Sequence, residues 1–240
     1  MKYVHKFATV SEYNQAQAAV PNSDPWISYL EPNGLLTYSS AVNIQKAANG
    51  YEYVDLGLPS GLLWATCNVG ANTPEQSGGY FAWGETATKS GDHSWETYVY
   101  GLESNPTKYN FTDNKTILDL SDDAASVNLG GDWRMPTKEE MQELIAETQS
   151  SQETVNGISG KRFTGQNNNS IFIPETGNYW GSNFSSGGLM LWTSSRDSSK
   201  GNAMFLVAGS IVLNRDRRCY GHPVRGVLSP SRHWHNPLLL

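Results

Sequence analysis

Small residues that favour turns make up a large part of this chain, since Gly, Ser and Asn together account for 69 of its 240 residues. Eight Trp and twelve Tyr accompany them, whereas charged residues reach only 17%. A helical bundle is excluded, because its long helices need runs of stronger helix formers. Disorder is disfavoured, because aromatic residues are spread along the whole chain. The composition therefore predicts a loop-rich β structure whose loops are ordered by buried rings.

The charges are unevenly distributed along the chain. Its 17 basic and 23 acidic side chains give a net charge of −6, which excludes nucleic acid as a partner recognised by overall charge. Residues 51–188 carry 7 basic and 18 acidic side chains, net −11, whereas residues 189–240 carry 7 and 2, net +5. Two interpretations are open. The two parts neutralise each other within the fold, or the basic segment is a binding surface with its own chemistry.

No membrane insertion is expected from the hydropathy of the chain. Its longest apolar run, 203–208, has six residues, whereas a membrane-spanning helix needs about 20. Residues 1–7 lack the apolar core of a secretory signal. We therefore expect a protein that is made in the cytoplasm and stays there or leaves by a route other than signal-directed export.

The pattern of turns and apolar residues divides the chain into a small N-terminal assembly or tether unit (1–48), a main domain (50–228) and a C-terminal tail (229–240). The first part is predicted to contain a short helix over 11–19 and two strands, 26–30 and 35–38. Glu31-Pro32-Asn33 between these strands resembles the metal- and sugar-binding triplet of calcium-dependent lectins. No further ligands lie nearby, so turn chemistry is the favoured interpretation.

Two helices are predicted in the main domain. The first is capped by Ser121 and ends at Gly130. The second begins at Thr137, which forms a capping box with Glu140. Short strands are expected at 53–56, 62–66, 80–83, 161–164, 170–173, 191–193, 203–208, 210–214 and 224–227. Because regular elements are sparse, rings must fill the interior. The core is expected to contain Trp64, Trp83, Trp133 and Trp192.

The sequence shows no catalytic, metal or cofactor site, so we expect a protein that is not an enzyme. It has no G-x-S-x-G motif, no phosphate-binding glycine loop and no CxxC pair. The acids Asp122-Asp123 and Glu139-Glu140 are explained by helix starts. His233-Trp234-His235 would bind a metal only weakly and is assigned to the tail. Cys67 and Cys219 are expected to be free thiols.

Six blocks of the main domain together resemble one family. They are VDLGLPSGLLWATCNVG at 54–70, YFAWGE at 80–85, GDWRMPT at 131–137, SIFIP at 170–174, LWTSS at 191–195 and VRGV at 224–227. This looks like the major paralogous domain abundant in Bacteroidetes and Fibrobacter, which is related to the formylglycine-generating-enzyme subtype of the C-type-lectin-like fold. The resemblance covers residues 51–228 and implies an α+β fold with two helices and short twisted antiparallel strands. The two neighbouring cysteines that the oxidase chemistry needs are not matched.

The amino-terminal part carries a second, shorter resemblance. Ile27-Ser28-Tyr29-Leu30-Glu31, followed by Gly34 and Tyr38, resembles the beginning of Bacteroides prophage virion proteins. It implies a virion protein that is assembled in the cytoplasm, forms a homo-oligomer in some cases, and meets a protein or glycan receptor on a bacterial surface. The alternative is a non-variable cell-surface adhesin or envelope module of the same paralogous family.

Domains of this kind also resemble the variable proteins of diversity-generating retroelements, in which adenines of a carboxy-terminal coding segment are mutated. Asn codons randomised in this way never yield Lys, Glu, Gln, Met or Trp. Residues 205–222 contain none of these five types. The resemblance therefore implies a diversified segment here, whereas an ordinary β-hairpin with the same composition is the alternative.

A ligand-binding face is predicted in this carboxy-terminal segment. Alternation places Leu206, Ala208 and Val212 in the core together with Val224, with a register break at Gly209-Ser210. The opposite face would be an apolar patch rimmed by arginines, including Arg218, as protein recognition uses. The alternative is a strand buried on both faces. The predicted face consists of Arg196, Asp197, Asn202, Phe205, Val207, Gly209, Ile211, Leu213, Arg215, Arg217, Cys219 and His222.

Overall fold

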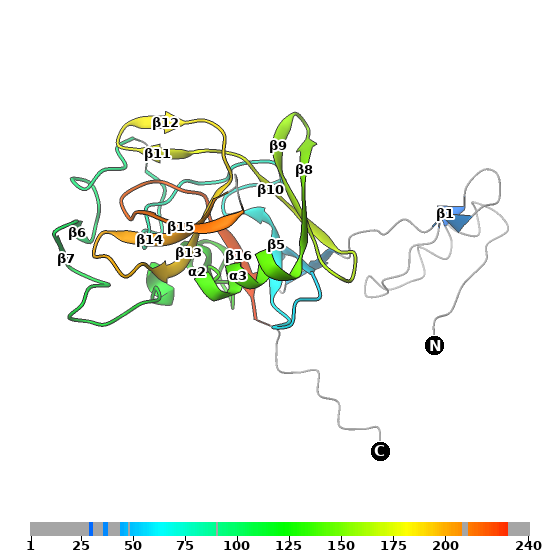
Figure 1. Ribbon diagram of the computed structural model, residues 1–240, viewed down its shortest axis with the longest axis horizontal. Helices are drawn as coiled ribbons and strands as arrows, with labels where there is room; N and C mark the ends of the chain where they lie inside the picture. Colours follow the sequence, from blue (N-terminus) through cyan, green and yellow to red (C-terminus); the bar gives the residue numbers. More distant parts are fainter. Residues whose placement is uncertain are drawn as a thin grey trace, which may run out of the picture. The chain divides into compact units, whose positions relative to one another are not determined.

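The computed structural model of this chain describes residues 29–30, 36–37, 44–47, 49–89, 91–207 and 211–229. The chain divides into two compact units, residues 1–43 and residues 44–240 (Figure 1). In the first unit, β1 (Tyr29–Leu30) pairs antiparallel with β2 (Leu36–Thr37), within the two segments predicted as strands. The predicted helix over 11–19, the turn at 31–34 and the tail beyond residue 229 lie outside the described residues.

The second unit contains small sheets in which every strand pair is antiparallel. The four-stranded sheet has the order β16-β5-β4-β3, with β3 Ile44–Lys46, β4 Glu52–Asp55, β5 Leu63–Asn68 and β16 Arg225–Leu228. Since β3 belongs to this sheet, the second unit begins at Ile44. The sequence analysis predicted that the main domain begins at residue 50. The pairing of β16 with β5 joins the two ends of the unit.

Two three-stranded sheets and two hairpins complete the strands. One sheet, β10-β9-β8, consists of β8 Gln149–Val155, β9 Ile158–Thr164 and β10 Ser170–Pro174. The other, β13-β14-β15, consists of β13 Met190–Arg196, β14 Asn202–Val207 and β15 Val212–Arg217. The hairpins pair β6 Gly101–Leu102 with β7 Asn105–Pro106, and β11 Asn178–Trp180 with β12 Asn183–Ser185.

The two α-helices of the described residues lie where the sequence predicts them. They are α2 (Ala124–Leu129), preceded by the 3-10 helix η1 (Leu120–Asp122), and α3 (Lys138–Glu147). The capping box of α3 is present, with Glu140 N–H donating to the Thr137 hydroxyl at 3.2 Å. The cap of α2 is Asp123 and not Ser121, because η1 takes up the preceding turn and the Asp123 carboxylate accepts the Ser126 N–H at 2.9 Å.

The second unit is therefore α+β in the general sense, with few helices and many antiparallel strands. In Figure 1, α2 and α3 lie along its lower side and the β11–β12 hairpin along its upper side. One predicted strand is absent, and the sequence analysis did not predict β3, β6, β7, β8, β11 or β12. Residues 80–83 form no strand and make a single bridge from Phe81 to His222. β8 was not predicted, because its polar, exposed side chains give no apolar alternation.

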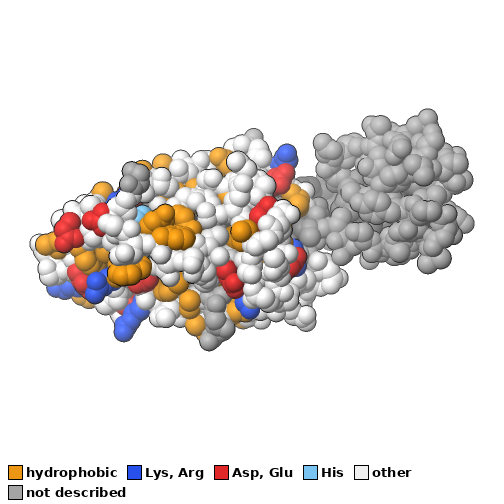
Figure 2. All heavy atoms as spheres, turned by 90° about the horizontal axis from the view of Figure 1, so that it is seen from above, with side chains coloured by type: hydrophobic (Ala, Val, Ile, Leu, Met, Phe, Trp, Pro, Cys, Tyr) orange, Lys and Arg blue, Asp and Glu red, His pale blue; other side chains and the backbone are white. Residues whose placement is uncertain are grey.

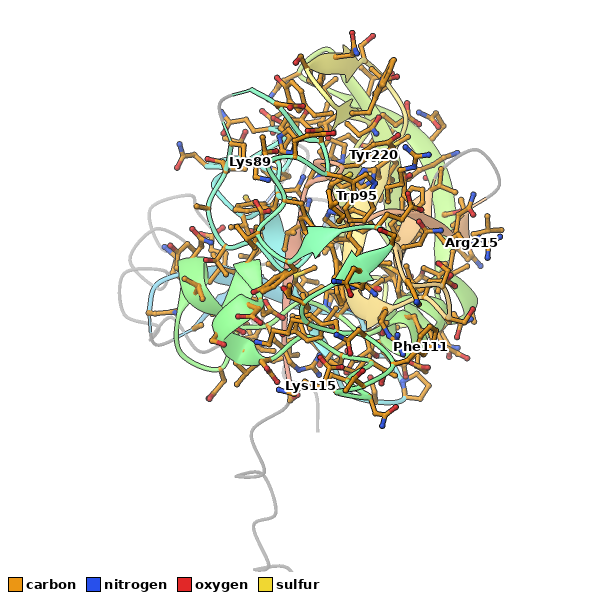
Figure 3. All side chains as sticks on the ribbon, turned by 90° about the vertical axis from the view of Figure 1, so that its left-hand side faces the viewer. Lys89, Trp95, Phe111, Lys115, Arg215 and Tyr220 are labelled. Atoms are coloured by element: carbon orange, nitrogen blue, oxygen red, sulfur yellow. The ribbon has the colours of Figure 1, made fainter. Side chains whose placement is uncertain are left out.

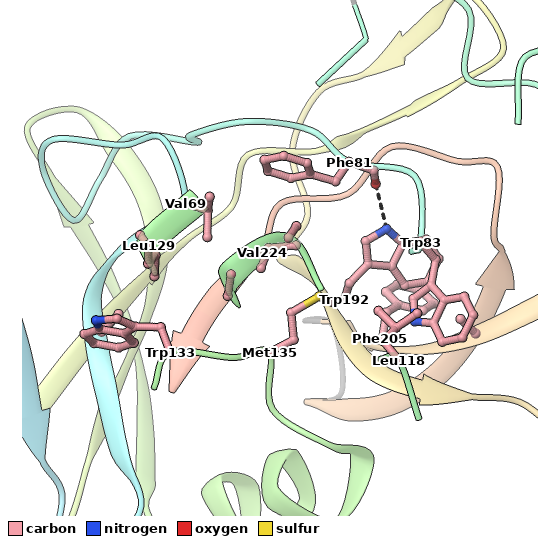
Figure 4. Close-up of a cluster of buried hydrophobic side chains, with 14 of the residues drawn as sticks. Val69, Phe81, Trp83, Leu118, Leu129, Trp133, Met135, Trp192, Phe205 and Val224 are labelled. Carbon is pink, nitrogen blue, oxygen red and sulfur yellow. Dashed lines mark hydrogen bonds between the residues drawn. The ribbon is translucent and has the colours of Figure 1, made fainter. Parts of the chain in front are cut away.

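All four predicted tryptophans lie in the core and are at most 1% exposed. Figure 4 shows Trp83, Trp133 and Trp192 within the main hydrophobic cluster. The indole of Trp192 donates to the Phe81 carbonyl, and that of Trp83 to the Thr193 carbonyl, both at 2.8 Å. Each ring thus fills volume and also donates to a backbone carbonyl, and the Phe81 carbonyl accepts the His222 N–H as well.

Arg225 on β16 is fully buried, which the sequence pattern does not indicate. Its guanidinium donates to the carbonyls of Ala65 and Thr66 on β5 at 3.0 and 2.6 Å, and to the Asn68 side chain at 2.8 Å. It also donates to the Phe172 carbonyl on β10 at 3.2 Å. Burial lowers the pKa of Arg225 to about 10, so the group stays charged at neutral pH.

Replacing Arg225 with Leu should therefore destabilise the protein by about 4 kcal/mol, because several buried carbonyls lose their donor at once. Arg225→Lys should lie between wild type and Leu, since an ammonium keeps the charge but cannot reach the same acceptors together. Urea unfolding measures both effects. A loss below about 1 kcal/mol for the Leu variant would show that this network is dispensable.

Candidate ligand-binding surface

The segment predicted to bind ligands forms the sheet β13-β14-β15, with β14 in the centre and β15 at one edge. Directly paired residues share a face, so Trp192, Phe205 and Asn214 form one row across the three strands. Phe205 and Ala203 on β14 belong to the main core, and Leu206 on the opposite face of the strand is also fully buried. The central strand is therefore buried on both faces, as the alternative interpretation holds.

Three of the twelve residues predicted on the surface are buried: Phe205 is 5% exposed, Cys219 1% and His222 0%. The loop after β15 returns over this face of the sheet. The His222 ring stacks on Phe205 with centroids 4.9 Å apart, and the backbones of His222 and Phe81 exchange two hydrogen bonds. The prediction that these three side chains are displayed is wrong, because strand alternation does not report a loop that covers the strand. Arg218, expected at the rim, is also fully buried.

Val212 was predicted in the core, and this prediction is wrong because its side chain is 44% exposed. It lies on the edge strand, where a neighbouring strand is present on one side. Leu206 and Val224 are fully buried, as predicted. Ala208 and Gly209 lie outside the described residues. Partial burial is found for Asn202, Val207, Ile211 and Leu213.

Arg215 and Arg217 on β15 are exposed, and Arg196 and Asp197 at the end of β13 are partly buried. The pairings place Arg196 on the face of Ala203 and the two exposed arginines on the opposite face, so the set wraps around this end of the sheet. The Arg196 guanidinium lies 5.0 Å from the centre of the Phe111 ring, and that of Arg217 lies 5.9 Å from the Tyr220 ring. We call this set, the three arginines with Asp197 and the two rings, the arginine–aromatic surface. Figure 3 shows Phe111, Arg215 and Tyr220 on the same face of the molecule.

The loops place the two rings, and the sequence analysis missed both. Phe111 lies in the loop between β7 and η1, and it is 54% exposed. The neighbouring Thr116 accepts the Arg196 backbone N–H at 2.7 Å, which holds this loop against the end of β13. The contact of an exposed Phe with Arg196 is visible only in three dimensions, because 85 positions separate the two residues in the sequence.

Asp197 is the acid of this surface. Its carboxylate lies 3.7 Å from the Arg215 guanidinium and accepts the Ser199 N–H at 3.0 Å. Partial burial raises the pKa of Asp197, but hydrogen bonds from Ser199 and the charge of Arg215 outweigh it and lower the pKa overall. Asp197 is therefore ionised at neutral pH and lies within ion-pair distance of Arg215.

A groove of about 600 Å³ lies apart from this surface, and its lining includes Glu75, Tyr80, Glu175 and Thr176. The nearby β11–β12 hairpin exposes about half of Phe184, and Figure 2 shows a hydrophobic patch on this side of the molecule. Within the described residues no group of three or more His, Cys, Asp or Glu side chains is placed to hold a metal ion. Cys67 and Cys219 are free thiols.

The comparisons with known proteins add no relative. The chain matches no family model, no curated protein and no solved structure. No helix in the described ranges is long and apolar enough to cross a membrane.

The burial of Phe205 can be tested by comparing the stability of two variants. Phe205→Ala should destabilise the protein by about 3–5 kcal/mol, because it opens a cavity beside Trp192 and His222. Arg217→Ala, on the same sheet but exposed, should change the free energy of unfolding by at most about 0.5 kcal/mol. Urea denaturation compares the two variants. Similar small effects for both would mean that Phe205 belongs to the surface after all.

Proposed function

We propose that this protein binds a receptor on a bacterial surface through the arginine–aromatic surface, and that residues 50–228 form a C-type-lectin-like domain that carries it. The ordered sequence blocks of the family support the domain assignment. The positions of the two helices and the short antiparallel strands agree with it. The resemblance of residues 27–38 to prophage virion proteins favours a virion as the location.

The observation that carries the proposal is the separation of the core from the surface within one sheet. Trp192 and Leu206 on β13 and β14 are fully buried, whereas Arg215 and Arg217 on the adjacent β15 are exposed. Substitutions on β15 therefore change what the surface presents with little change in stability. A diversified binding protein needs such a strand, which supports a variable segment in this position.

The alternative, a non-variable adhesin of the same family, predicts a different genetic setting. A variable protein requires a reverse-transcriptase gene and a near-copy of the final coding segment beside its own gene. An adhesin of the cell envelope requires neither.

The surface can be tested with the triple variant Arg196→Gln, Arg215→Gln and Arg217→Gln. Labelled wild-type protein should bind intact Bacteroides cells of a susceptible strain in flow cytometry, and the triple variant should bind at least about tenfold more weakly. Its melting temperature should stay within about 3 °C, since the changed side chains are largely outside the core.

The matched control removes the same number of charges elsewhere, with Lys46→Gln, Lys138→Gln and Lys161→Gln. This control should bind cells like wild type, because the loss of three positive charges is then not at the proposed surface. Equal binding by wild type and the arginine variant would contradict the proposed function. If both variants lost cell binding equally, the effect would come from the overall charge of the protein and not from the proposed surface.

A further inference from the structure

The side chain of Arg196 is the least satisfied polar group of the arginine–aromatic surface. Its Nε and Nη1 atoms are enclosed, yet neither has a hydrogen-bond acceptor among the described residues. The Phe111 ring lies against the guanidinium, with its centre 5.0 Å away. An enclosed donor without an acceptor costs about 1–3 kcal/mol, and a charged one costs more. Such a group fits an anion that supplies the missing acceptors.

The charge of the surface points in the same direction. Three arginines and one acid, Asp197, give it a net charge of +2, and the adjacent Asp216 carboxylate lowers this to +1, in a chain whose net charge is −6. Arg215 has its carboxylate partner in Asp197, whereas Arg196 and Arg217 have no ion pair with any described acid. The nearby Asp216 carboxylate is engaged, because it is bonded to His222 at 3.1 Å and to the Arg217 N–H at 2.8 Å. The surface therefore favours an acidic partner.

The edge of β15 argues against an extended peptide as this partner. A peptide strand added to the sheet would need the outward backbone N–H groups of β15. The Arg215 N–H donates to the Asn214 side chain, and the Arg217 N–H to the Asp216 side chain, both at 2.8 Å. These local bonds close the edge, so recognition falls to side chains.

The remaining features suit a sugar. The Phe111 ring, 54% exposed, and the partly exposed Tyr220 ring offer flat apolar surfaces for the C–H face of a sugar ring. The exposed Asn214 amide can bond to hydroxyl groups. The planar guanidinium of Arg196 can take a carboxylate through two parallel hydrogen bonds.

We infer that the arginine–aromatic surface binds an acidic saccharide, and that Arg196, held on Phe111, anchors the sugar carboxylate. This inference rests on the proposed function, because it names the ligand class of the same surface. It requires the Arg196 guanidinium to turn one of its enclosed edges toward the ligand.

The test is a calorimetric titration of the full chain with tetragalacturonate, with its fully methyl-esterified form, and with tetraglutamate. Wild type should bind the acid at least about tenfold more tightly than the methyl ester, which has the same sugar rings without the charge. Binding should weaken at high salt, as exposed ion pairs do. Tetraglutamate should bind more weakly than the acidic sugar, because it offers the carboxylate without the ring.

Variants assign the effect to the anchor. Arg196→Gln should weaken binding of tetragalacturonate about tenfold, and Arg196→Lys should lie between it and wild type, since Lys keeps the charge without the planar fork. Phe111→Ala, at an exposed position that leaves the fold intact, should also weaken binding. Lys138→Gln is the matched control and should bind like wild type.

Three results would overturn the inference: equal binding of acid and methyl ester, tighter binding of tetraglutamate, or an Arg196→Gln variant that is folded and binds like wild type. The failure of the proposed function is a separate result. If cell binding depends on the three arginines but tetragalacturonate neither binds nor competes with cells, the function stands and the saccharide assignment falls. If cell binding is independent of the arginines, the function itself falls.

Discussion

The guanidinium of Arg225, which is fully buried and has no ion pair with any described carboxylate, joins three parts of this fold. It donates to two carbonyls and one amide side chain of β5 and to the Phe172 carbonyl of β10. It therefore links the four-stranded sheet, in which the two ends of the unit meet, to the β8–β10 sheet. A buried charge is costly, and the cost is offset here because the acceptors would otherwise lack donors. The network therefore holds β16 against β5 and β10.

The same solution recurs where regular pairing is missing. Arg218 donates to the Tyr109 carbonyl at 3.0 Å and lies 5.0 Å from the Trp83 ring, and the Tyr98 hydroxyl donates to the Trp83 carbonyl at 2.7 Å. In a chain this rich in loops, large side chains with donor groups replace the strand ladder as partners of buried carbonyls. Buried side chains thus stabilise the fold, and the exposed side chains of the edge strand β15 contribute little to its stability.

The sequence predicts well what depends on local rules. The capping box at Thr137 needs neighbours three residues apart, and the four predicted tryptophans fill an interior in which regular elements are sparse. The sequence does not predict features that depend on contacts between distant segments of the chain. Phe205 alternates like a surface residue, and only the returning loop, which carries His222, buries it. Phe111 joins the arginines from a loop far away in the chain. The polar strand β8 has no periodic signal at all, because its side chains are exposed and its pairing with β9 gives it order.

The central claim is that the core fixes the fold and the arginine–aromatic end of the sheet is free to vary. Two libraries displayed on yeast and challenged with protease test it directly. The first randomises Arg196, Asp197, Val212, Asn214, Arg215 and Arg217. The second randomises Trp192, Phe205, Leu206, Cys219, His222 and Val224. The account predicts that most members of the first library stay protease-resistant and few of the second do. Equal fractions of resistant members in the two libraries would contradict it.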